Sequence, residues 1–190
     1  MYQALEAKNI KSLCGNAKAF FTSTTAFGGK IERMQSMPYK IAQSVLVVMY
    51  TPAWDVLLLQ RTHGDGRGGA FWQSVTGSKD AEDEPWTQVA VREVLEETGI
   101  HALEEGYLLQ DWGLENTYPI YPQWLHRYPP GTCMNTERVF GLQVPSYAHV
   151  TLNPREHTAF AWHAWREAAD RCYAPSNAEA ILHLPAFALA

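Results

Sequence analysis

The stretch GSKDAEDEPWTQVAVREVLEETG, residues 77–99, carries the clearest helix signal in this chain of 190 residues. Pro85 suits the first position of a helix, because the N–H that proline lacks has no partner there. Gly99 can end the helix in a left-handed conformation. We therefore predict a helix from Pro85 to the residue before Gly99. Its apolar stripe, which we expect to be buried, is formed by Val91, Val94 and Leu95.

Three carboxylates lie in the last turns of this predicted helix. Glu93, Glu96 and Glu97 have the spacing i, i+3 and i+4, which places them on one side of the helix. The helix dipole opposes an anion there by about 0.3–1 kcal/mol. Arg92 offsets part of this cost, so a solvated, salt-bridged surface is one interpretation. The other is a platform for a hard cation such as Mg²⁺, which prefers carboxylate oxygens and keeps waters that a phosphate can replace.

Strand-like segments surround this helix. Apolar, β-branched runs occur at residues 44–50, 55–61 and 71–77 before it, and at 137–144 and 158–165 after it. Helical patterns follow at 166–172 and 176–184. Strands, a helix, further strands and final helices predict an α/β (α+β) fold in which a mixed sheet lies between helical layers.

The first 36 residues show neither helical nor strand periodicity. We expect a poorly ordered extension over residues 1–36 and a domain over residues 37–190. The glycine-rich segment HGDGRGG, residues 63–69, lacks the GK[ST] ending of a phosphate-binding P-loop, and we interpret it as a flexible loop.

Composition narrows the function further. A hydrophobic content of 46% suits one globular domain. The net charge of −5 argues against a nucleic-acid partner, and an anionic ligand would need a divalent cation between the like charges. We find no membrane span or secretory signal, and we expect a cytoplasmic protein with no obligate protein partner. No cysteine spacing suggests zinc or a redox centre, so we expect three free thiols: Cys14, Cys133 and Cys172.

The helix and its surroundings resemble the Nudix hydrolases, whose box reads G-x5-E-x7-R-E-U-x-E-E-x-G-U, with U aliphatic. From Glu84 to Ile100 every spacing of the box fits. Between Gly77 and Glu84, however, there are six residues instead of five. The extra residue leaves open whether Glu84 or a neighbour, Glu82 or Asp83, takes the first glutamate position.

The resemblance implies a Nudix-type α/β/α sandwich and an enzyme that depends on Mg²⁺, with Mn²⁺ as a substitute. It implies Glu93, Glu97 and Glu156 as metal ligands. It implies Glu93, Glu96 and Glu156 as catalytic residues, with the identity of the base open. In the implied reaction, water attacks a phosphorus atom of a triphosphate and pyrophosphate leaves. Arg92 would orient a carboxylate.

The segments FWQSVTGS (71–78), HRYPPG (126–131), NTERVF (135–140) and REHTAFAW (155–162) resemble the branch of the family that cleaves a pterin triphosphate. This implies substrate contacts by Lys40, Arg61, Thr76, Tyr118, Tyr121 and Ser176. Solvated surface charge and core packing are the alternatives for the charged and the aromatic members of this set. A pyrophosphatase for canonical or oxidised nucleotides and a non-catalytic binding module are the competing functions.

Overall fold

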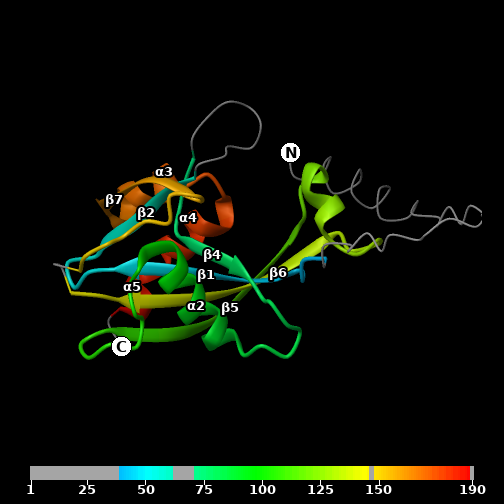
Figure 1. The fold of residues 1–190 in the computed structure, drawn as a ribbon. Helices are drawn as coiled ribbons and strands as arrows, with labels where there is room; N and C mark the ends of the chain where they lie inside the picture. The colour runs from blue at the N-terminus through cyan, green and yellow to red at the C-terminus, as the bar shows by residue number, and fades with distance from the viewer. Residues whose placement is uncertain (1–38, 62–70, 146–147, 189–190) are drawn as a thin grey trace, which may run out of the picture.

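The structure is a computed structural model that describes residues 39–61, 71–145 and 148–188. The expected extension over residues 1–36 and the glycine-rich loop at 63–69 lie outside the described residues. Along the described chain, a helix at residues 86–98 and a short 3₁₀ helix interrupt the strands, and the last elements are helices (Figure 1).

The strands are β1 (Gln43–Tyr50), β2 (Asp55–Arg61), β3 (Trp72–Gln73), β4 (Val75–Ser78), β5 (Leu108–Pro119), β6 (Met134–Gln143) and β7 (His157–Ala164). The helices are α2 (Trp86–Thr98), the 3₁₀ helix η1 (Pro122–Arg127), α3 (Trp165–Arg171), α4 (Pro175–Leu182) and α5 (Leu184–Phe187). The single strand predicted at 71–77 is two short strands, β3 and β4. The sequence patterns did not reveal β5, because many of its side chains are exposed and its alternation of apolar residues is weak.

The strands form one mixed sheet in the order β3-β2-β1-β6-β5, with β4 paired to β1 and β7 paired to β2. β1 and β6 run parallel, and the other pairs are antiparallel. β1 therefore contacts three strands, and seven of its eight residues are buried. This burial explains why its sequence is continuously apolar rather than alternating.

Alternate residues of β1 point to two separate cores. Val45 and Val47 pack with α2 on one face of the sheet, whereas Leu46 and Val48 pack with α3, α4 and α5 on the other. Figure 1 shows α2 on one side of the sheet, and the C-terminal helices α3 and α4 on the other. The prediction of an α/β/α sandwich with a mixed sheet is confirmed.

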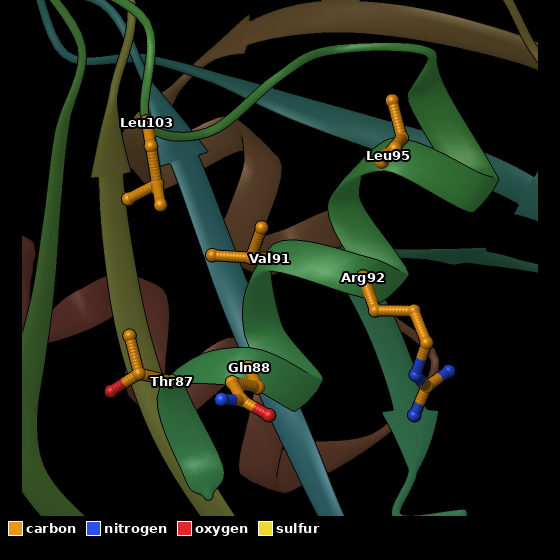
Figure 2. A pocket seen from close by; sticks show the side chains of 6 residues that line it. All are labelled: Thr87, Gln88, Val91, Arg92, Leu95 and Leu103. Carbon is orange, nitrogen blue, oxygen red and sulfur yellow. The ribbon is translucent and has the colours of Figure 1, made fainter.

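Helix α2 faces the sheet with a different stripe from the one predicted. Its buried residues are Val89, Ala90, Glu93, Val94, Glu97 and Thr98. Leu95 is 39% exposed, so the prediction of a buried stripe was wrong for this residue, whereas Val91 is half-buried and packs against the core under α2. They line an open pocket on the outer face of the helix together with Thr87, Gln88, Arg92 and Leu103 (Figure 2). The helix thus buries the carboxylates of Glu93 and Glu97 and leaves the apolar side chain of Leu95 exposed.

The two ends of α2 follow the sequence signals closely. The helix begins at Trp86, one residue later than predicted. Pro85 is therefore the N-cap residue and not the first helical residue. Gly99 adopts φ = 70°, and its N–H donates to the carbonyl of Leu95. The left-handed conformation there is one that glycine adopts without strain, which is why the helix ends at this residue.

Cys172 is a free thiol, whereas Cys133 is disulfide-bonded, so the expectation of three free thiols is wrong at Cys133. Cys14 lies outside the described residues. Among the helices that the structure describes, none has the length and hydropathy needed to cross a membrane.

Candidate active site

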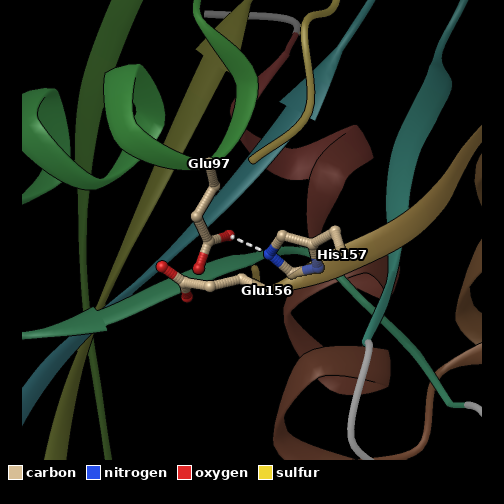
Figure 3. A group of neighbouring side chains, drawn as sticks. All are labelled: Glu97, Glu156 and His157. Atoms are coloured by element: carbon tan, nitrogen blue, oxygen red, sulfur yellow. Dashed lines mark ion pairs between the residues drawn. The ribbon is translucent and has the colours of Figure 1, made fainter. Parts of the chain in front are cut away.

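Glu97, Glu156 and His157 form a cluster where the last turn of α2 meets the start of β7 (Figure 3). Each residue offers one potential metal-ligand atom, and these atoms lie within 4.8 Å of one another. The imidazole Nε2 of His157 is 3.2 Å from Oε2 of Glu97. Glu156 is the accessible member, with 39% of its side chain exposed, while the other two are buried.

The carboxylate of Glu97 fits a divalent cation. Its side chain is 1% exposed, and neither oxygen accepts a hydrogen bond from the described residues, since the approach of His157 is a close contact without hydrogen-bond geometry. Burial raises the pKa of Glu97, although His157 and Arg61 oppose this shift. A buried anion without hydrogen-bond donors is costly. Hard cations prefer such carboxylate oxygens, so the donor set suits Mg²⁺ or Mn²⁺.

Glu93 lies one turn before Glu97 on α2 and is not part of this three-residue cluster. Burial raises the pKa of Glu93 to about 7, against the opposing charge of Arg92. Its carboxylate lies directly against the backbone of Gly77 in β4. A Cβ atom on Gly77 would stand 1.7 Å from the Cδ of Glu93, so only glycine leaves room for this carboxylate.

Arg92 holds the start of the box together. Its Nη1 donates to Oε1 of Glu93 at 2.7 Å, and its Nη2 donates to the carbonyl of Ser78 at 2.9 Å. Its Nε donates to Glu84 at 3.2 Å, and Glu84 also accepts from the N–H of Asp80. Glu84 therefore holds the position left open by the extra residue in the loop. Arg92 orients carboxylates, as the resemblance implied.

Glu96 differs from the other two glutamates of the helix. Half of its side chain is exposed, and its Oε2 is 3.6 Å from Nη1 of Arg92. The three carboxylates that the spacing placed on one helix side thus divide into two buried groups and one solvated group. Glu93 and Glu97 lie on the buried face of α2, and Glu96 lies outside it.

Two cations predicted to contact substrate lie at this site. Nη1 of Arg61, at the end of β2, is 3.5 Å from Glu156 and 4.0 Å from Glu97. The pKa of Lys40 is lowered, chiefly by desolvation and by the charge of Arg127, while Glu93 and Glu156 oppose the shift. The ammonium of Lys40 therefore lies within electrostatic range of the carboxylates.

The other predicted substrate residues lie elsewhere. Thr76 pairs with Leu46 in the sheet, so it faces α3–α5 rather than α2, and its hydroxyl accepts from Gln73. Tyr118 and Ser176 both donate hydrogen bonds to Glu137, a buried residue of β6. Tyr121 is 42% exposed and packs edge-on against Trp124, with ring centroids 5.3 Å apart.

Three residues of these networks were not found from the sequence. His157 stands next to Glu156, and a histidine beside a candidate ligand at the start of a strand could have been flagged. Glu137 and Asn135 occur two and four residues before Val139, which is buried in the core under α3–α5. Period-2 alternation places all three on one face of β6, so the charge at Glu137 was a detectable anomaly.

Comparison with known proteins gives consistent results. The NUDIX domain profile matches residues 40–184. The chain is 38% identical over 149 residues to dihydroneopterin triphosphate diphosphatase of Escherichia coli K12, which covers 78% of this chain and 95% of that protein. The protein of the same name from Haemophilus influenzae is 34% identical over 146 residues, with 76% and 88% covered.

A solved structure of the E. coli enzyme is also similar to this chain. The E. coli dihydroneopterin triphosphate pyrophosphohydrolase superposes with a TM-score of 0.67 at 37% sequence identity, and the match covers 80% of this chain and 97% of that one. Fold, box and flanking segments therefore agree with one another over nearly the whole described region.

Proposed function

This chain belongs to the Nudix hydrolase family, and on that premise we propose that it is a dihydroneopterin triphosphate diphosphatase of folate biosynthesis. It converts the triphosphate to dihydroneopterin monophosphate and pyrophosphate. The observation that carries this proposal is the identity of 34–38% to two proteins of that activity, over 88–95% of their length. The active domain comprises residues 37–190.

Nudix enzymes typically depend on a divalent metal, and we propose Mg²⁺, with Mn²⁺ as a substitute. Glu93, Glu97 and Glu156 would hold it. The partnerless oxygens of Glu97 support this assignment. When bound, the cation supplies charge neutralisation for the phosphates and acidifies a water molecule. The imidazole of His157, 3.2 Å from the Glu97 carboxylate, lies beside the proposed ligand atoms.

The proton of the attacking water passes to a glutamate, for which we propose Glu93. In the metal-free protein burial raises the pKa of Glu93 to about 7, so the site disfavours a charge on this carboxylate until a cation compensates it. Arg92 keeps one oxygen of Glu93 fixed, and Gly77 leaves the space that the carboxylate occupies. Glu156 and the exposed Glu96 are the alternative bases, and their Gln variants would separate these roles.

Arg61 and Lys40 are the cations proposed to bind the triphosphate. Arg61 is one-third exposed and already lies beside the carboxylates, so its guanidinium can reach a phosphate oxygen that enters the site. Tyr118, Tyr121, Thr76 and Ser176 are the residues proposed to contact the rest of the substrate. The substrate is a small molecule, and the proposal involves no nucleic acid or membrane.

A substrate panel tests the proposal. Pyrophosphate release would be measured with Mg²⁺ for dihydroneopterin triphosphate, dATP and 8-oxo-dGTP. We expect the highest kcat/KM for the pterin, with pyrophosphate rather than orthophosphate as product and with no turnover in EDTA. A clear preference for either deoxynucleotide would replace the proposal with a nucleotide pyrophosphatase. Absence of turnover on every substrate would instead indicate a binding module.

A further inference from the structure

A third buried carboxylate, after Glu93 and Glu97, lies on the opposite face of the sheet from α2. Glu137 of β6 is 4% exposed and pairs with Ser44 of β1. It lies on the same face as Val139, whose side chain packs in the core under α3–α5. The mechanism proposed above gives this carboxylate no role.

Neutral donors surround Glu137. Asn116 Nδ2 donates to its Oε1 at 3.3 Å, and the Tyr118 hydroxyl donates to its Oε2 at 3.0 Å. The hydroxyl of Ser176 at the start of α4 also donates to it. A carboxylate offers about four acceptor positions, so these three donors leave one open. Burial raises the pKa of Glu137, and the three donors oppose that shift.

Asn135 adds a second open acceptor beside it. Its Nδ2 donates to the Ser44 hydroxyl at 2.7 Å and to the Tyr118 oxygen at 3.0 Å. The Tyr118 hydroxyl donates its hydrogen to Glu137, so the Tyr118 oxygen can only accept a hydrogen bond from Asn135. The amide nitrogen of Asn135 must therefore be the atom that faces Tyr118. The opposite end, Oδ1, is buried and has no partner among the described residues.

We propose that Glu137 and Asn135 recognise the ring of the substrate through two hydrogen bonds. Each side chain would accept one N–H group from a ring edge on which an amino group is adjacent to a ring N–H. The two acceptors lie two residues apart on one face of β6: Glu137 keeps one open acceptor position, and Oδ1 of Asn135 has no partner among the described residues. This inference deepens the proposed function and rests on it for the identity of the ring.

The chemistry of that edge separates substrates. A 2-amino-4-oxo pterin presents a ring N–H next to an amino group, and guanine presents the same pair. Adenine presents an amino group next to a ring nitrogen that is a hydrogen-bond acceptor. This nitrogen would face one of the two protein acceptors, Glu137 or Asn135, without a hydrogen between them. Hypoxanthine keeps the ring N–H but lacks the amino group. A site that hydrogen-bonds an edge rejects the analogue that leaves its buried polar groups unpaired.

Two residues connect this pair to the predicted substrate contacts. Tyr118 and Ser176 were expected to contact substrate, and both donate to Glu137. Both are only partly buried, unlike the carboxylate that they contact. They therefore form the accessible side of a network whose buried members are Glu137 and Asn135.

The test compares kcat/KM of the wild-type protein, Glu137→Gln and Glu115→Gln on dihydroneopterin triphosphate, dGTP, dITP and dATP. Glu115 is the matched control, because it is an exposed carboxylate on β5 that contacts Arg138. We expect the wild-type protein to prefer the pterin to dATP, and dGTP to dITP, by at least about 10-fold each. Glu137→Gln should lower both ratios by about 10- to 100-fold, the range for hydrogen bonds to a charged group. Glu115→Gln should leave both ratios unchanged.

The outcomes separate this inference from the proposed function. Retained ratios in Glu137→Gln, with the wild-type protein still preferring the pterin, would overturn the inference alone. A wild-type preference for dGTP over the pterin, lost in Glu137→Gln, would overturn the proposed substrate and support the inference. A wild-type preference for dATP would overturn both. If Glu137→Gln does not fold, the wild-type protein decides: equal turnover of dGTP and dITP overturns the inference, and a 10-fold preference for dGTP supports it.

Discussion

Glu97 and Glu137 are carboxylates buried to almost the same depth, at 1% and 4% exposure, on opposite faces of one sheet. Glu97 accepts no hydrogen bond from the described residues, and its close neighbours are His157 and the cation Arg61. Glu137 accepts from an amide, a phenol and a hydroxyl. Depth of burial is the same, and the chemistry of the surroundings differs.

The difference teaches what each carboxylate can bind. A buried anion that accepts no hydrogen bonds keeps the full free-energy cost of its desolvation. Only a strong positive charge compensates that cost. An anion already held by neutral donors needs only a further N–H group. The α2 face is therefore suited to a metal ion and the α3–α5 face to a neutral ring.

The largest expected effect comes from Glu97→Gln, which keeps the shape of the side chain and removes its charge. We expect kcat to fall by at least about 10²-fold, as when a transition state loses a preorganised electrostatic interaction. Melting temperature in EDTA should not fall, because the variant removes a buried charge. Glu105→Gln, an exposed residue beyond α2, is the control. Turnover close to wild type would mean that the α2 face holds no metal.

Gly77→Ala should have the next largest effect. The added methyl group would occupy the position of the Glu93 carboxylate, so the carboxylate must move while the charge of the site is unchanged. A displacement of about 1 Å in a catalytic group can cost about 10²-fold in rate, and we expect a loss of about 10- to 100-fold in kcat. Gly106→Ala provides a comparison: a Cβ there meets no neighbouring atom, and the backbone strain that its φ of +87° causes lies outside the site. The position of Glu93 would be unimportant if the two variants lost equal activity.

Stability should depend on pH through Glu93. Its pKa is about 7 in the folded protein and about 4.5 when unperturbed, so the folded state binds more protons between these values. The free energy of unfolding of the metal-free protein should therefore fall as pH rises from about 5 to 8, by about 2 kcal/mol. Thermal melts in EDTA at both pH values would measure this. Glu93→Gln has no proton to lose and should show a smaller fall; an equal fall in both proteins would place the titrating group elsewhere.

The ring face should respond more weakly, and only in selectivity. Tyr118→Phe removes one donor to Glu137, and we expect the ratio of kcat/KM for dihydroneopterin triphosphate over dATP to fall about 10-fold. Tyr121→Ala removes an exposed ring that packs only against Trp124 in the described contacts, and we expect a fall of about 5-fold or less. A larger effect at Tyr121 than at Tyr118 would move ring recognition away from Glu137.

The smallest expected effect concerns Arg138, the neighbour of Glu137 on the other face of β6. Its guanidinium contacts Asp111 at 2.9 Å and Glu115 at 3.3 Å, both of them exposed carboxylates. Exposed ion pairs contribute about 0–1 kcal/mol to stability. Arg138→Gln should therefore shift the melting temperature by a few degrees at most and leave kcat/KM unchanged for every substrate. A change in selectivity would show that the two faces of β6 are coupled.

The sequence predicted the sandwich and the helix of the box because both depend on local patterns. Gly99 ended the helix as expected, since a left-handed residue is a local requirement. The buried face of α2 was predicted wrongly at Leu95, because hydrophobicity favours this residue as an inward one. The sheet instead receives Glu93 and Glu97, whose inward position serves the site and not the core.

The remaining site contacts depend on tertiary structure. The approach of His157 to Glu97 joins β7 to α2, and the bonds of Glu137 join β6 to β5 and α4. No local spacing encodes such contacts. The role of Glu84 was open for the same reason, since only the folded loop shows that Arg92 contacts it despite the extra residue.

The parallel pairing of β1 with β6 has a consequence for synthesis of the chain. Val45 lies beside Arg138, and the two segments are separated by most of the domain. Such long-range pairing is slow to form, because loop-closure entropy must be overcome before the contacts stabilise it. On the ribosome, β1 emerges early and cannot pair with β6 until β6 has been synthesised. A nascent chain that carries the complete box therefore still lacks Glu137, Glu156 and His157. The box is translated well before the protein can act, and neither carboxylate site can be assembled until synthesis is nearly complete.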